Sequence, residues 1–226
     1  MSLGTLLIYF AILLIIPLWA QGKVKSTYKK YSKIAISSQM TGAQVARMIL
    51  DDNGLYDVQI EEVKGVLSDH YDPRKKVVRL SSGNYRGHSM AAAAVAAHEV
   101  GHAIQDAEGY GFLRFRTALV PIASFGSNTA IWIILIGAIL GAMNLVLIGI
   151  FFMAFAVLFQ LVTLPVEFNA SSRAMDQLVM TGIIQNNEER QTKKVLDAAA
   201  LTYVAAALVA VAELIRFILI FVASND

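Results

Sequence analysis

One stretch decides how this chain is interpreted: Ala91-Ala92-Ala93-Ala94-Val95-Ala96-Ala97-His98-Glu99-Val100-Gly101-His102-Ala103-Ile104-Gln105. Its alanine run strongly favours a helix. Positions i and i+4 of a helix share a face, so the imidazoles of His98 and His102 point the same way, with Glu99 beside them. The stretch fits the H-E-x-x-H pattern of zinc hydrolases; with four His in 226 residues, roughly 0.002 such motifs would arise by chance. We therefore predict a Zn²⁺ site here, and the alternative is a helix whose two histidines face solvent and bind nothing.

The composition indicates a membrane protein. Hydrophobic residues make up 56% of the chain and charged residues only 16%, whereas ordinary soluble domains carry about 25% charged residues. The chain has no cysteine, so disulfides and thiolate metal ligands are excluded, and zinc must be held by His, Glu or Asp. The net charge of +2 gives no reason to expect nucleic-acid binding.

The first apolar segment, residues 3–22, is predicted to be a retained transmembrane helix. About 18 apolar residues suffice to cross a bilayer. A cleavable signal peptide has its basic residues before the apolar run, but here they come after it, beginning with Lys23 and Lys25. The positive-inside rule then places the N-terminus outside and the next segment in the cytoplasm.

Three further apolar segments, 118–140, 144–165 and 201–222, are long enough to span a membrane. Of the 19 Lys and Arg residues, 14 lie in segment 23–117, four in segment 166–200 and one within the last span. This asymmetry predicts a multi-pass plasma-membrane protein with both polar segments in the cytoplasm and both termini outside. The expected fold is mainly α, with four transmembrane helices and a small α/β cytoplasmic domain.

Local patterns predict the elements of that cytoplasmic domain. Gly42–Asp52 has helical apolar spacing, and Thr41 can cap its N-terminus. Residues 58–63 and 76–81 are typical of strands. Ser89 is expected to cap the helix that carries the histidines. Because the second strand directly precedes that helix, we expect its edge to be open for an extended substrate.

Two histidines do not complete a catalytic zinc site, which usually has three protein ligands and a water. A longer pattern, H-E-x-x-H-x-x-G-x-x-H, would need Gly at position 105 and His at position 108, where this chain has Gln105 and Glu108. Asp106 shares the helix face but lies about 12 Å along the axis from His98. It could hydrogen-bond an imidazole but could not join the coordination.

Glu167 is the predicted third ligand. Two spans separate it from His98, so both lie on the same side of the membrane. We expect Glu167 to open a new helix on which Ser171, one turn later, shares its face. The alternative is that Glu167 only favours a helix N-terminus as an acidic residue.

Two resemblances follow from these residues. His98-Glu99-x-x-His102 followed by Glu167-Phe168-x-Ala170 resembles the membrane gluzincins of the HtpX and CAAX-prenyl-endopeptidase group, in which the later Glu is the third zinc ligand. In that group an Asp follows four residues later, where this chain has Ser171. The histidine would then be oriented by Asp106 or by Ser171 itself.

A closer resemblance, over nearly the whole chain, is to the YugP-type family of neutral zinc metallopeptidases. It is carried by four stretches: Asp69-His70-Tyr71-Asp72-Pro73, Arg79-Leu80-Ser81, Ala97–Gln105 and Pro165–Ser171.

The resemblance implies a zincin-like cytoplasmic domain and the hydrolysis of peptide bonds by a zinc-dependent metalloendopeptidase. Glu99 is expected to act as general base. Because Glu167 directly follows a span, the metal should lie near the cytoplasmic membrane surface. The expected partners are the lipid bilayer, membrane or membrane-proximal protein substrates, and a second copy of the chain or another membrane protein. The competing hypothesis is a non-proteolytic membrane scaffold that retains a structural zinc.

Two further predictions concern side chains outside the motif. If one residue stabilises the oxyanion, we select His70, because it lies in a stretch that carries the resemblance; His88, Tyr203 and Arg173 are the alternatives. For each of the four taken alone, the plainer interpretation is a polar residue of a turn or of the surface. Two charged side chains within the last span, at positions 213 and 216, are expected to form a mutual ion pair.

Overall fold

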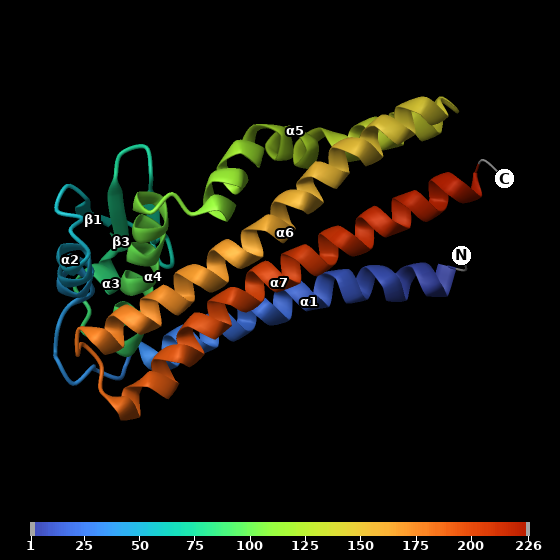
Figure 1. The fold of residues 1–226 in the computed structure, drawn as a ribbon. Coiled ribbons are helices and arrows are strands. Elements are labelled where there is room, and N and C mark those ends of the chain that lie inside the picture. Colours follow the sequence, from blue (N-terminus) through green and yellow to red (C-terminus); the bar gives the residue numbers. More distant parts are fainter. Residues whose placement is uncertain (1–2, 225–226) are drawn as a thin grey trace. The chain divides into compact units, whose positions relative to one another are not determined.

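The structure, a computed structural model, describes residues 3–224 and is mainly helical (Figure 1). The predicted extracellular ends of the chain, residues 1–2 and 225–226, lie outside that range. The elements follow in the order α1 (Leu3–Tyr31), α2 (Gly42–Asp52), β1 (Gln59–Val63), β2 (His70–Asp72), β3 (Val77–Ser81), α3 (Ser82–Tyr85), α4 (Met90–Ala107), α5 (Gly111–Ile139), α6 (Met143–Met180) and α7 (Asn186–Ala223).

Four of these helices, α1, α5, α6 and α7, are long and apolar enough to cross a membrane. The predicted mainly α, four-span fold is therefore confirmed. The described chain divides into two compact units. An apolar unit contains residues 3–18, 111–165 and 203–224, and a polar unit contains residues 19–110 and 166–202.

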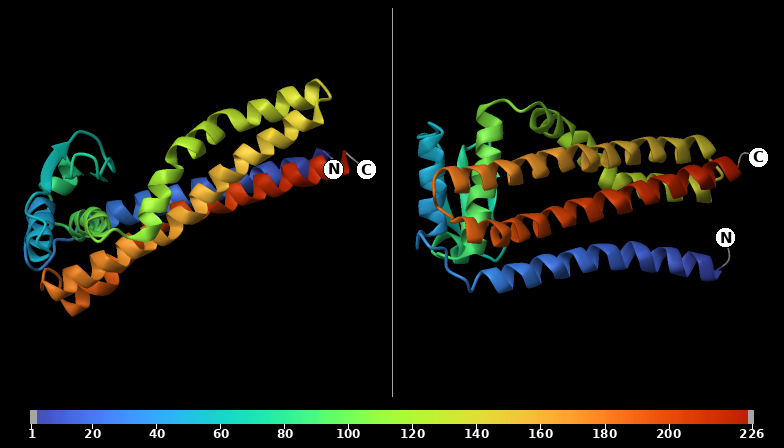
Figure 2. Two further views of the ribbon diagram at one scale, coloured as in Figure 1. Left: turned by 45° about the horizontal axis from the view of Figure 1, so that its top comes forward. Right: turned by 60° about the horizontal axis from the view of Figure 1, so that its bottom comes forward.

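Within the apolar unit, close helix contacts depend on glycine. The second half of α5 runs beside α6, and the two are joined by a short turn at Gly141, whose φ is +64° (Figure 2). A Cβ added to Gly126 would lie 2.4 Å from the carbonyl oxygen of Phe152. The predicted ion pair in the last span is confirmed, because Arg216 binds Glu213 at 2.5 Å.

The polar unit contains a three-stranded sheet in the order β1-β3-β2. β1 runs parallel to β3, and β2 runs antiparallel to it, with His70 opposite Arg79. β3 is thus the central strand, with neighbours on both sides. The expectation that the edge of this strand is open to substrate was wrong, because the sequence does not show which strands become neighbours. The edges of the sheet are β1 and β2.

The predicted local signals account for the ends of the helices. Thr41 and Gln44 form a capping box at the start of α2, and the hydroxyl of Ser89 accepts a hydrogen bond from the backbone of Ala92 at the start of α4. α4 ends at Ala107, and the glycine at position 109 has a φ of +66°. The two predicted strands are confirmed as β1 and β3, and each begins one residue later than predicted.

Helix α4 lies at the centre of the polar unit's core. All of its alanines except Ala107 are almost fully buried, and most of them pack in one cluster with residues of α2, β3, α6 and α7. Small side chains let neighbouring backbones approach α4 closely. At Gly101, an added Cβ would lie 2.7 Å from the carbonyl oxygen of Ala170 on α6.

One prediction about α6 was wrong. Glu167 does not open a new helix, because α6 continues without interruption through Pro165. Proline removes one backbone hydrogen bond, but membrane helices tolerate this where neighbouring groups compensate. The alternative in which Glu167 only favours a helix N-terminus is therefore excluded, and Glu167 and Ser171 still share a face one turn apart.

Candidate metal centre

Three side chains converge between α4 and the C-terminal part of α6. The Nε2 atom of His98 lies 3.3 Å from Oε2 of Glu167, and Nε2 of His102 lies 3.6 Å from the same oxygen. One donor atom from each of the three residues lies within 4.8 Å of the others. Glu167 is only 3% exposed, so the donor atoms of the three side chains meet in a largely buried place.

The donor set fits zinc in chemistry and in spacing. Two imidazoles and one carboxylate are a known ligand set of catalytic zinc sites, which keep a fourth position open. Two such donors around one tetrahedral ion lie about 3.3 Å apart, close to the separations of the histidine nitrogens from Glu167. His98, His102 and Glu167 would therefore hold the metal.

Gln105 fixes the orientation of His102. The side-chain nitrogen of Gln105 donates to the backbone oxygen of Val166 at 2.8 Å and to Oδ1 of Asn169 at 2.9 Å. Since a backbone carbonyl can only accept, the Gln105 oxygen must be the atom that lies 3.0 Å from Nδ1 of His102. Nδ1 then carries the proton and donates it, which leaves the lone pair of Nε2 free to bind a metal.

Ser171 occupies the corresponding position beside the other ring. Its hydroxyl lies 3.2 Å from Nδ1 of His98. Of the two predicted orienting residues, Ser171 therefore contacts a histidine. Asp106 instead accepts a hydrogen bond from the hydroxyl of Tyr71 at 2.9 Å, which ties strand β2 to helix α4.

The electrostatics of the site differ between its two carboxylates. Burial raises the pKa of Glu99 above its ordinary value, although both histidines oppose this shift. Burial alone would also raise the pKa of Glu167, but its contacts with His102 and His98 outweigh this and hold the pKa well below its usual range. Glu167 is therefore held in its charged carboxylate form, whereas Glu99 is a carboxylate whose proton affinity is increased.

His70 lies at the exposed start of β2. Its Nδ1 faces the backbone oxygen of Ser68 at 2.9 Å, and its Nε2 lies 3.3 Å from Arg79. The three-residue group at the metal centre does not include it, and its catalytic role stays a prediction. The stretches at 69–73 and 79–81 do meet, because Arg79 also binds Asp72 at 3.0 Å.

Among the alternatives to His70, Arg173 has other partners. It binds Glu108 at 2.7 Å and donates to Asn169 at 2.8 Å. Sequence reasoning missed the orienting role of Gln105, which was considered only as the residue that excludes a longer zinc motif. Its position three residues after His102, almost one helical turn away, is the signal that could have indicated it.

These features define a class of protein: an integral membrane protein with a His-His-Glu centre suited to zinc. The chain belongs to the family described as "putative neutral zinc metallopeptidase", whose family model matches residues 6–222. It is 56% identical over 208 residues to the "putative membrane protease YugP" of Bacillus subtilis (strain 168), covering 92% of each chain. No solved structure gives a significant match.

Proposed function

We propose that the chain is a zinc-dependent metalloendopeptidase of the gluzincin type, with Glu99 as its general base and Glu167 as its third metal ligand. The observation that carries this proposal is the approach of both imidazoles to one buried carboxylate from another helix. The family description and the name of the Bacillus relative support the same reaction class.

Glu99 is suited to transfer a proton. It lies next to His98 on α4 and is 8% exposed. A base that must take up and release a proton works best when its pKa lies near the working pH, and the burial of Glu99 shifts its pKa in that direction. In peptide hydrolysis, Glu99 takes a proton from the attacking water while the hydroxyl forms a bond to the carbonyl carbon. Glu99 then delivers that proton to the amide nitrogen as the C–N bond breaks, which gives a carboxylate and an amine.

The remaining residues prepare the site for this step. When bound, zinc lowers the pKa of a water ligand to about 7 and polarises a carbonyl group. Gln105 and Ser171 hold the two rings with their Nε2 atoms toward Glu167. At the edge of the sheet, β2 is tied to α4 by Tyr71, and an edge strand can pair with an extended peptide.

We also propose that the site faces the cytoplasm of a plasma-membrane protein and acts on membrane or membrane-proximal proteins. Glu167 follows the apolar segment 144–165 by two residues, which is about 3 Å along a helix. A reporter fused after Asp226 tests the orientation, since both termini are expected outside. A cytoplasmic reporter there would contradict the proposed topology.

The activity is tested by comparing the purified wild type with Glu99→Gln. Both should bind one zinc ion, because Glu99 is not a proposed ligand, and the variant should cleave membrane-protein fragments about 10²–10⁴-fold more slowly. An equal rate of cleavage by both proteins would exclude Glu99 as the base.

The second candidate function is a membrane scaffold that retains a structural zinc. The burial of Glu99 argues against it, because a structural site gains nothing from a buried carboxylate beside its ligands. If both proteins bind zinc, neither cleaves any fragment, and both rescue a deletion phenotype equally, the scaffold hypothesis holds in place of the peptidase.

A further inference from the structure

A cavity lies apart from the metal centre, between the C-terminal part of α1 and the N-terminal part of α7. It is a cavity of about 530 Å³, within the range of small-molecule sites. Its lining includes three lysines, Lys23 and Lys30 from α1 and Lys194 from α7. All of these residues belong to the polar unit.

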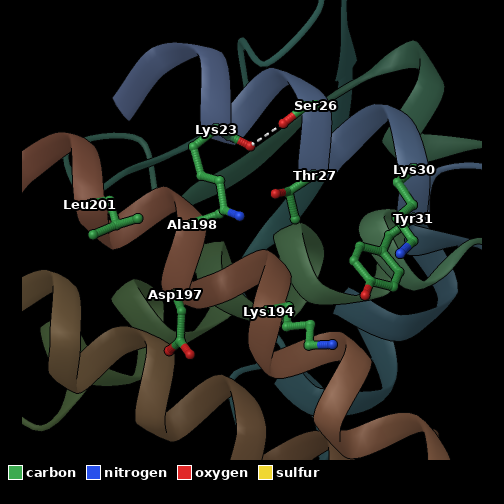
Figure 3. A pocket seen from close by; sticks show the side chains of 9 residues that line it. All are labelled: Lys23, Ser26, Thr27, Lys30, Tyr31, Lys194, Asp197, Ala198 and Leu201. Carbon is green, nitrogen blue, oxygen red and sulfur yellow. Dashed lines mark hydrogen bonds between the residues drawn. The ribbon is translucent and has the colours of Figure 1, made fainter. Parts of the chain in front are cut away.

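The cavity has the chemistry of an anion site. In Figure 3, Lys23 and Thr27 reach from α1 toward α7, and the side chain of Lys194 extends in the direction of Tyr31. Within residues 3–224, no salt bridge to a carboxylate is found for any of the three lysines. The one acidic residue of the lining, Asp197, already binds Lys193 at 3.0 Å. The three lysines therefore line a space with little compensating negative charge, although the ammonium of Lys30 also lies 5.4 Å from the centre of the Tyr31 ring.

The residues that line the cavity lie beside two apolar segments, which indicates that its anion is the phosphate of a lipid head group. Lys23 follows the first apolar segment, 3–22, directly, and Leu201, which also lines the cavity, begins the last one, 201–222. The polar ends of two apolar segments thus contribute to one cavity, and in the proposed topology this is the level at which lipid phosphates lie. Basic pockets between membrane helices on the cytoplasmic side bind the head groups of anionic lipids.

Topology alone does not explain this arrangement. The positive-inside rule accounts for lysines after the first span, but it does not require Lys194, 171 positions after Lys23, to line the same cavity. We propose that this cavity binds the head group of an anionic phospholipid, with Lys23, Lys30 and Lys194 as its phosphate-binding residues. The site is independent of the proposed peptidase activity.

The test uses the full-length protein in detergent and native mass spectrometry with phosphatidylglycerol or phosphatidylcholine. Phosphatidylglycerol should remain bound to the wild type at least about tenfold more than phosphatidylcholine. The triple variant Lys23→Gln/Lys30→Gln/Lys194→Gln should lose this preference. The control Lys25→Gln/Lys29→Gln/Lys33→Gln removes the same charge from lysines that do not line the cavity, and it should keep the preference.

Two outcomes would overturn the proposal. An equal loss in both triple variants would show diffuse attraction to basic residues in place of a site. If inorganic phosphate at the same concentration displaces the lipid fully, the cavity selects a free anion and not a head group. Zinc content reports folding independently, and Lys194→Gln alone, with an expected loss of about fivefold, replaces the triple variant if that variant does not fold.

Discussion

Gly101 of α4 packs directly against the backbone of Ala170 on α6. A Cβ at position 101 would lie 2.7 Å from the carbonyl oxygen of Ala170 and 3.3 Å from its α-carbon. Gly101 immediately precedes His102, and Ala170 immediately precedes Ser171. The close approach of the two backbones is therefore what brings the histidines of one helix to the carboxylate of the other.

Gly101→Ala should weaken both the fold and the metal site. Alanine favours a helix by about 1 kcal/mol over glycine, but overpacking a tight contact costs about 1–3 kcal/mol, and here the obstacle is backbone that cannot rotate away. We expect a lower midpoint of thermal unfolding and weaker zinc binding, measured by scanning calorimetry and by competition with a chelator.

Gly22→Ala is the matched control. Gly22 also lies inside a helix, but a Cβ there meets no atom within 4 Å. It should leave zinc affinity unchanged and raise stability slightly. If Gly101→Ala behaves in the same way, α6 is not held against α4 by this contact.

Gln105→Leu should reduce zinc affinity about 10–100-fold, as is typical when a group that orients a metal-bound histidine is removed. Leucine is similar in size but offers no acceptor to Nδ1 of His102 and no donor to Val166. Zinc affinity is measured by chelator competition. Gln177→Leu makes the same change on α6, where the side chain contacts Asn53, and it should leave zinc binding intact; equal losses would indicate a general loss of stability.

Ser171→Ala should have a smaller effect in the same direction, about tenfold in zinc affinity. The hydroxyl contacts Nδ1 of His98, but its removal leaves the ring packed in place. The neighbouring Ser172→Ala is the control, because Ser172 is exposed. No difference in affinity between the two variants would mean that Ser171 does not orient His98.

Glu167→Gln should abolish stoichiometric zinc binding. An amide is neutral and a poorer zinc donor than a carboxylate, so one of three ligands is lost. Metal content after dialysis measures this directly. Glu108→Gln changes the exposed residue that directly follows α4 and binds Arg173, and it should keep one zinc per chain. Full stoichiometry and affinity in Glu167→Gln would remove Glu167 from the proposed ligands.

The sequence was sufficient where local signals decide the structure. Caps at Thr41 and Ser89 placed the starts of α2 and α4, and the spacing of His98 and His102 fixed one face of a helix. The pairing of that face with Glu167 needed only the count of membrane spans between them, because each span changes the side of the membrane.

Non-local contacts could not be predicted in the same way. The role of Gln105 depends on Val166, 61 positions away, which reaches it only after α4 and α6 have packed. The position of β3 at the centre of the sheet depends on β1, which precedes it by 18 positions, and on β2. Glu167 was expected to open a new helix after the third span, but α6 continues through Pro165, because a membrane helix tolerates a proline where neighbouring groups compensate for the lost hydrogen bond.

The ion pair of Glu213 and Arg216 allows a last prediction about the apolar unit. Arg216 also lies over the rings of Tyr9 and Phe217, and Tyr9 donates to Glu213 at 3.0 Å. Arg216→Leu leaves the charge of the partly buried Glu213 without its cation, and the cost is at most about 3–5 kcal/mol, the value for breaking a fully buried pair. The double variant Glu213→Gln/Arg216→Leu removes both charges, and a glutamine can still accept from Tyr9. It should therefore be more stable than Arg216→Leu alone, as measured by thermal unfolding in detergent. If the double variant is the less stable of the two, the arginine contributes mainly through its aromatic contacts and not through the ion pair.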